Sequence, residues 1–212
     1  MKTSISFLKS NDTREETINR IIATDANYIH VDVMDGEFVE RKVLEIDEVV
    51  KLLSKSRKPL DIHLMVAHPL EYISAFKNLN AHYITIHSEI EDNIEDLIKL
   101  IHSYGIRAGL AINPSTEVIK ISKYLTMIDQ VLIMGVNPGY GGQELIPECV
   151  DKIKELIDMR DNYNYHYLIS LDGGVNGETR KLLDGLDIIV SGSFVCMSDD
   201  YQTKINELKW GV

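Results

Sequence analysis

The segment His30-Val31-Asp32-Val33-Met34-Asp35-Gly36 decides the fold prediction, because it combines a strand pattern with two polar side chains on one face. A β-strand repeats every two residues, so His30 and Asp32 point to one side while Val31 and Val33 point to the other. Burying an imidazole together with a carboxylate is costly unless a metal ion or proton chemistry compensates. The segment therefore predicts a buried strand that carries chemistry near the turn where it ends.

Further apolar runs rich in β-branched residues occur along the whole chain, and a helical or polar segment follows each of them. Amphipathic stretches between the runs keep the 3.6-residue spacing of a helix, for example from Ile94 to Ile101 and from Leu145 to Ile157. Eight such units predict a (β/α)8 TIM barrel with one domain over residues 1–212. The runs are 3–8, 28–34, 60–66, 82–87, 106–112, 130–136, 167–172 and 187–191.

An open doubly wound sheet is the alternative architecture. Such sheets usually carry G-x-G-x-x-G after the first strand, to bind a dinucleotide. Here that turn reads Leu8-Lys9-Ser10-Asn11-Asp12, and the first glycine is Gly36. The barrel is therefore the favoured architecture.

Composition limits the classes of partner. Lys and Arg total 22 against 33 Asp and Glu, a net charge of −11, which is the wrong sign for a nucleic-acid partner. No apolar run approaches the ~18 residues that cross a membrane, and the N-terminal segment does not resemble a signal peptide. We expect a cytoplasmic protein with no membrane association. Cys149 and Cys196 lie far apart without metal-ligand spacing, so we expect two buried, unpaired thiols.

The active site of a (β/α)8 barrel gathers at the C-terminal ends of its strands, where several polar residues of this chain fall. His30, Asp32, His63 and Asp172 would supply two imidazoles and two carboxylates, a set that suits Zn²⁺ or Fe²⁺. Asp35 and Asp61 are competing carboxylates. Asp35 precedes Gly36 and is more typical of a turn.

Methionines and glycines also fall at the predicted strand ends. Met34, Met65 and Met134 either fill the core or line a reactive centre. The glycine clusters 137–143, 172–175 and 190–193 lack the P-loop pattern and would by themselves indicate tight turns. In these barrels, however, the loops after the last strands commonly bind phosphate through backbone N–H groups, which needs no Lys or Arg.

With these residues in view, the chain resembles the ribulose-phosphate 3-epimerase family over essentially its full length. The matching segments are residues 30–39, 61–66, 137–143, 172–175 and 191–193, which read HVDVMDGEFV, DIHLMV, NPGYGGQ, DGGV and SGS. Two differences stand out: Glu40-Arg41 follows Phe38-Val39 where the family usually has Pro-Asn, and Ile5 precedes Ser6 where the family often has Pro.

The resemblance implies one divalent metal ion bound by His30, Asp32, His63 and Asp172. Zn²⁺ or Fe²⁺ is the preferred ion, and Mn²⁺ or Co²⁺ is an alternative. The resemblance also implies that Asp32 and Asp172 are the acid/base pair, and that Ser6 and His63 contact a sugar phosphate. Met34, Met65 and Met134 would line the reacting carbons. The phosphate would be held by Gly141, Gly142, Gly173, Gly174, Gly192 and Ser193.

The implied activity is isomerisation of D-ribulose 5-phosphate to D-xylulose 5-phosphate in the pentose phosphate pathway. Two-base proton transfer at C3 through an enediolate is the implied mechanism. Two alternatives are a 3-epimerase of another phosphorylated ketose, such as allulose 6-phosphate, and a catalytically silent phosphate-binding barrel. Assembly into a homo-oligomer is left open.

Overall fold

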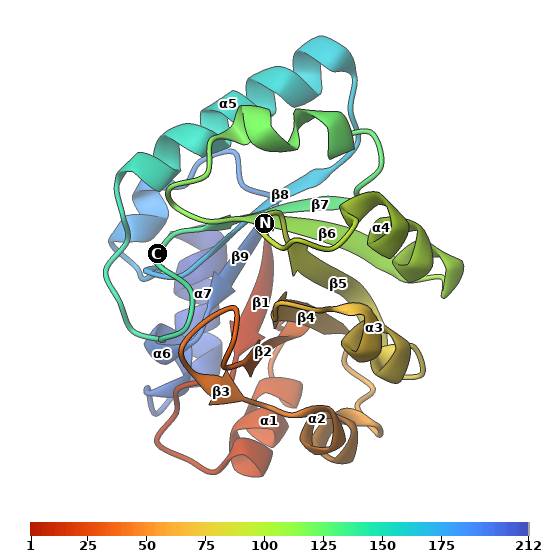
Figure 1. Ribbon diagram of the computed structural model, residues 1–212. Coiled ribbons are helices and arrows are strands. Elements are labelled where there is room, and N and C mark those ends of the chain that lie inside the picture. The colour runs from red at the N-terminus through yellow and green to blue at the C-terminus, as the bar shows by residue number, and fades with distance from the viewer. Residues whose placement is uncertain (212) are drawn as a thin grey trace.

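The computed structural model describes residues 1–211, whose strands form one closed barrel surrounded by helices (Figure 1). The strand order is β1-β9-β8-β7-β6-β5-β4-β2-β3, and pairing of β1 with β2 closes the sheet. All pairs in the barrel are parallel. The predicted (β/α)8 fold class is therefore confirmed. A single domain over residues 1–212 stays a prediction.

The barrel strands are β1 (Lys2–Ser6), β2 (Tyr28–Asp35), β4 (Leu60–Met65), β5 (Ala81–His87), β6 (Arg107–Ile112), β7 (Gln130–Met134), β8 (Leu168–Asp172) and β9 (Ile188–Ser191). The short strand β3 (Lys42–Val43) pairs antiparallel with the end of β2. The helices are α1 (Arg14–Ile22), α2 (Ile46–Leu53), α3 (Leu70–Phe76), α4 (Ile94–Ser103), α5 (Glu148–Tyr163), α6 (Ser193–Cys196) and α7 (Tyr201–Trp210), with 3₁₀ helices η1 (Val118–Tyr124) and η2 (Thr179–Leu182).

Each predicted apolar run overlaps one barrel strand, and the ends of run and strand agree within two residues. Parallel strands are covered on both faces, which explains why the runs are nearly continuous rather than alternating. Val31 and Val33, on one face of β2, are completely buried, and so is His30 on the opposite, inner face. Strand β3 was not predicted, because a two-residue strand outside the barrel leaves no periodic signal.

The helices form where capping and spacing favour them. Thr13 caps α1 in a capping box with Glu16, and the Asn93 side chain accepts backbone N–H groups at the start of α4. Helix α4 buries the predicted apolar face from Ile94 to Ile101. The second predicted stretch begins too early, because Leu145 and Ile146 precede α5 and Ile146 instead donates its N–H to the Gly135 carbonyl.

Strand register brings the polar side chains to one end of the barrel. His30 is opposite Asp61, and Asp32 is opposite His63, so β2 and β4 present two layers of paired polar groups. Both cysteines are free and buried, as predicted. Within residues 1–211, no helix is long and apolar enough to cross a membrane.

Candidate active site

Two histidines and two aspartates converge at the C-terminal end of the barrel. His30 Nε2 lies 3.3 Å from Asp32 Oδ1 and 3.4 Å from Asp172 Oδ2. His63 Nδ1 lies 3.4 Å from the same Asp32 oxygen and 3.5 Å from the same Asp172 oxygen. One candidate ligand atom from each of these residues lies within 4.8 Å of the others. The four residues predicted as metal ligands are thus brought together from β2, β4 and β8.

The donor atoms of this cluster fit a divalent ion. His30 Nε2 and His63 Nδ1 are buried and lack a hydrogen-bond partner within the described residues. Leaving such nitrogens unpaired in a protein interior costs free energy, whereas a metal ion would satisfy both lone pairs. Two imidazole nitrogens and two carboxylate oxygens form a mixed N/O set that suits Zn²⁺ or another first-row ion. The cluster could therefore hold a metal ion.

The charges of the cluster support one another. Burial alone would lower the pKa of His30, but the carboxylates of Asp32, Asp61 and Asp172 outweigh it and raise that pKa well above its usual value. The pKa of His63 is raised for the same reason, by Asp172 and Asp32. Burial would raise the pKa values of both aspartates, but the histidines lower them. Without metal, the carboxylates therefore favour the protonated form of both histidines.

A buried carboxylate orients His30. Asp61 Oδ2 lies 2.9 Å from His30 Nδ1 and accepts a hydrogen bond of 2.7 Å from the Ser4 hydroxyl. The N–H of His30 is therefore held at Nδ1, which leaves Nε2 free to bind a metal ion. Asp61 is not among the residues that could hold the ion: it stands behind His30 and supports it.

The other competing carboxylate, Asp35, shapes the turn after β2. Its Oδ1 accepts the backbone N–H groups of Glu37 and Phe38, and its Oδ2 accepts the backbone N–H of Ala67. The prediction of a turn residue is confirmed.

A chain of side chains also leads away from His63. His63 Nε2 lies 2.9 Å from Nε2 of His87, and His87 Nδ1 lies 3.1 Å from Oε2 of Glu89. Burial lowers the pKa of His87 to about 4, so this imidazole is neutral near pH 7. Although burial opposes ionisation of Glu89, hydrogen bonds from His87, Asn113 and Thr116 lower its pKa to about 2.

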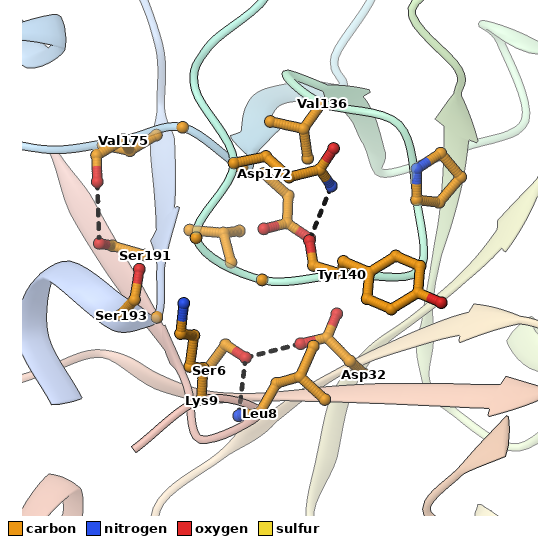
Figure 2. Close-up of a pocket in the computed structure, with 18 of the residues that line it drawn as sticks. Ser6, Leu8, Lys9, Asp32, Val136, Tyr140, Asp172, Val175, Ser191 and Ser193 are labelled. Atoms are coloured by element: carbon orange, nitrogen blue, oxygen red, sulfur yellow. Dashed lines mark hydrogen bonds between the residues drawn. The ribbon is translucent and has the colours of Figure 1, made fainter. Parts of the chain in front are cut away.

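A cavity of about 410 Å³ adjoins the cluster, and Figure 2 shows Asp32 and Asp172 among the residues that line it. Ser6, Asp32 and Asp172 line it, and the Ser6 hydroxyl donates a hydrogen bond of 2.6 Å to Asp32 Oδ2. Met34, Met65 and Met134 also line the cavity, with 2% of each residue exposed. His63 is completely buried beneath it, behind Asp32 and Asp172.

The glycine-containing loops after β7, β8 and β9 form a further wall of the cavity. The backbone turns sharply at Gly173 and Gly174, with φ of +98° and +71°, values that L side chains adopt only with strain. All six residues predicted to bind phosphate line this wall: Gly141, Gly142, Gly173, Gly174, Gly192 and Ser193.

His87, Glu89 and Lys9 were not recognised from the sequence pattern as functional groups, and Asp61 was considered only as a competing metal ligand. Asp61 stands next to His30 only through the register of β2 and β4, although its alternation with His63 places both on one strand face. His87 was visible as a polar residue at a strand end, and Glu89 follows two residues later. Lys9, after β1, also lines the cavity.

The fold and the cluster define a class of protein: a (β/α)8-barrel enzyme whose site combines a potential metal centre with paired carboxylates at the C-terminal ends of the strands. The model of the ribulose-phosphate 3 epimerase family matches residues 2–196, and the chain belongs to this family. It is an isomerase of the epimerase class.

Curated relatives support this assignment. Ribulose-phosphate 3-epimerase of Treponema pallidum is 40% identical over 173 residues, which cover 81% of this chain and 79% of the relative. Ribulose-phosphate 3-epimerase of Bacillus subtilis is 38% identical, with coverage of 87% and 86%. Among solved structures, a tryptophan synthase complex from Pyrococcus furiosus matches with a TM-score of 0.70, 14% identity and coverage of 98% and 97%, a likeness of fold alone.

Proposed function

We propose that this protein is a metal-dependent epimerase that interconverts D-ribulose 5-phosphate and D-xylulose 5-phosphate by two-base proton transfer at C3. One observation carries the proposal: Asp32 and Asp172 reach a common point beside two buried histidines, at the floor of a cavity walled by glycine loops. A purely phosphate-binding barrel has no need of two carboxylates directed at one point.

The two aspartates reach the cavity from different directions. Asp32 lies on β2, and Asp172 is the last residue of β8. Strands β1 and β9 lie between β2 and β8 in the sheet. One carboxylate takes the proton from C3, and the electron pair of that bond moves toward the C2 oxygen to give an enediolate. The other carboxyl group returns a proton to the opposite face of C3. No net oxidation occurs, so the reaction needs no redox cofactor.

The divalent ion would be held by His30, His63, Asp32 and Asp172. Zn²⁺ or Fe²⁺ is the preferred ion, and Mn²⁺ or Co²⁺ is an alternative. When bound, the ion supplies Lewis-acid stabilisation of the negative charge that develops on the substrate. Ser6 keeps the Asp32 carboxylate in place through its hydrogen bond.

The remaining cavity wall suits a small phosphorylated sugar. The three methionines offer a flexible, apolar surface to the carbon chain. At the other wall, glycines at 173, 174 and 192 and Ser193 allow a phosphate to approach the backbone closely. The charged residues Glu40 and Lys42 are not among the cavity-lining residues, and Arg41 reaches the wall only through the ring of Tyr140, with 5.9 Å between guanidinium carbon and ring centroid.

A steady-state assay with defined metals tests the proposal. The apoprotein reconstituted with Zn²⁺, Fe²⁺, Mn²⁺ or Co²⁺ is offered ribulose 5-phosphate, xylulose 5-phosphate and allulose 6-phosphate. We expect the highest kcat/KM with the pentose phosphates and incorporation of solvent deuterium at C3 in D₂O. Faster turnover of allulose 6-phosphate would reassign the substrate, and the absence of turnover with any metal would favour a silent barrel.

Substitution of each aspartate tests the acid/base roles. Asp32→Asn and Asp172→Asn should each lower kcat by about 10²–10⁴-fold, because each removes one of two proton-transfer groups. Both residues are also proposed ligands, so metal content is measured with the rate. An active Asp172→Asn enzyme with a full complement of metal would contradict the two-base mechanism.

A further inference from the structure

His87 is a completely buried histidine that the proposed proton transfer does not use. It stands at the end of β5, between His63 and Glu89, and the ring of Phe38 covers it at a centroid distance of 4.6 Å. The two ring nitrogens of His87 thus meet one imidazole and one carboxylate. This arrangement determines which atom donates and which accepts in each hydrogen bond from Glu89 through His87 to His63.

Glu89 sets these roles, because an ionised carboxylate can only accept hydrogen bonds. Its Oε1 accepts the backbone N–H of Asn113 at 2.8 Å and the hydroxyl of Thr116 at 2.5 Å. Its Oε2 faces His87 Nδ1 at 3.1 Å, so the proton of neutral His87 belongs on Nδ1. His87 Nε2 then carries a lone pair toward His63.

Lys152 holds the loop that supplies these donors. Its ammonium group donates to the carbonyl oxygens of Asn113, Pro114 and Thr116 at 2.7–2.8 Å. The Glu89 carboxylate therefore sits in a fixed cage of donors at the edge of the site.

His63 completes the chain. Its Nε2 lies 2.9 Å from His87 Nε2, which carries the lone pair, so His63 Nε2 must donate. The lone pair of neutral His63 then falls on Nδ1, the atom that faces Asp32 and Asp172 without a hydrogen-bond partner. In the opposite tautomer, His63 Nε2 would accept from His87, and the Nδ1 lone pair of His87 would face the Glu89 carboxylate. That arrangement is repulsive in a buried site.

We propose that His87 and Glu89 are positioning residues that fix the metal-binding tautomer and the ring orientation of His63. The inference rests on the metal centre of the proposed function and assigns roles to two residues outside its ligand set. His30 receives the same support from Asp61 directly, whereas His63 receives it through an intervening imidazole. Removing such supporting partners typically weakens metal affinity by about 10–100-fold.

Metal affinity of the purified apoprotein is the test, measured with Co²⁺ and Zn²⁺ in competition with a chromogenic chelator. We expect Glu89→Gln to weaken binding by about 10–100-fold, because its amide group must oppose either His87 or the donors at Asn113 and Thr116. His87→Phe, which removes the acceptor for His63, should do the same. His87→Gln can accept from His63 and donate to Glu89, so it should retain most of the wild-type affinity.

The control is Asp92→Asn. Asp92 contacts the exposed His68 at 3.3 Å, so this variant neutralises a carboxylate beside a histidine far less buried than His87 and should leave the affinity unchanged. Thermal melts of the metal-free variants check folding. At a pH above the raised pKa of His63, where the metal-free imidazole is neutral, the ¹⁵N resonances of its ring should report an Nε2–H tautomer in the metal-free wild type and a loss of that preference in metal-free Glu89→Gln.

The outcomes separate this inference from the function on which it rests. If the wild type binds neither ion, the proposed metal centre fails. If the wild type binds metal and the Glu89→Gln and His87→Phe variants bind it equally well with unchanged His63 resonances, the positioning role is wrong and the metal centre stands.

Discussion

At the scale of single residues, the site is built from pairs in which one member is a candidate metal ligand and the other orients it. Asp61 fixes the N–H of His30, and Ser6 fixes the carboxylate of Asp32. Such supporting groups keep ligand atoms aligned before a metal ion arrives, which reduces the entropy lost on binding. The sequence pattern identifies the candidate ligands, since they lie toward the C-terminal ends of strands. It does not assign the orienting roles of Asp61 and Ser6, which depend on strand register.

Lys9 offers a residue-scale prediction about substrate affinity. Among the described residues that line the cavity, it alone carries a positive charge, and its ammonium group lies against Gly142 in the glycine loop. We expect Lys9→Met to raise KM for a phosphorylated ketose by about 3–10-fold with little change in kcat, because a charge that attracts the phosphate is lost.

Lys55→Met is the matched control for Lys9. Lys55 is exposed in the turn after α2, so the variant changes the net charge equally but away from the cavity. The difference in KM between the two variants should shrink as salt concentration rises, since screening weakens the attraction. Equal KM values in the two variants at low salt would remove Lys9 from phosphate binding.

At the scale of elements, the sequence predicted the eight strands well because each barrel strand is a buried apolar run with few competing signals. It predicted the four ligand candidates because they stand near the C-terminal ends of such runs. It could not predict the layer in which each polar group lies, since that follows from the pairing of His30 with Asp61 and of Asp32 with His63. Nor could periodicity locate Lys9, which lies in a loop.

The turn after β8 gives an element-scale prediction. Gly174 has φ of +71°, and a Cβ there would lie 2.4 Å from the backbone of Leu145. Gly174→Ala should therefore lower the free energy of unfolding by about 2–4 kcal/mol, the sum of left-handed strain and forced displacement of the neighbouring loop. Urea denaturation measures this loss.

Gly105→Ala provides the comparison for Gly174. Gly105 has φ of +73°, but a Cβ there would have no atom within 4 Å. This variant should lose only the ~1–2 kcal/mol of left-handed strain. The same loss in both variants would show that packing between the turn after β8 and Leu145 contributes nothing.

At the scale of the whole molecule, the pairing of β1 with β2 lets residues from distant parts of the chain form one charged cluster. In the metal-free protein, the pKa values of His30 and His63 are raised and those of Asp32 and Asp172 are lowered. The histidines therefore stabilise the fold fully below their unfolded pKa of about 6.5, and this contribution is lost as pH rises through their raised folded values. The aspartates stabilise it above about pH 3.9, and that contribution is lost as pH falls through their lowered values.

Stability of the metal-free protein should accordingly decline as the pH rises above about 6.5 and through the raised pKa values of His30 and His63, while metal binding should strengthen over the same range. Zn²⁺ or Co²⁺ must displace the protons of His30 and His63, so the apparent affinity should rise by up to about 100-fold per pH unit while both protons are bound. Thermal melts with and without metal across this range measure both trends, and calorimetry in buffers of different ionisation enthalpy counts the protons released. In His30→Gln, fewer protons should be released and the rise should be shallower. A metal-induced increase in Tm that does not vary with pH would contradict this account, because binding would then displace no proton from either imidazole.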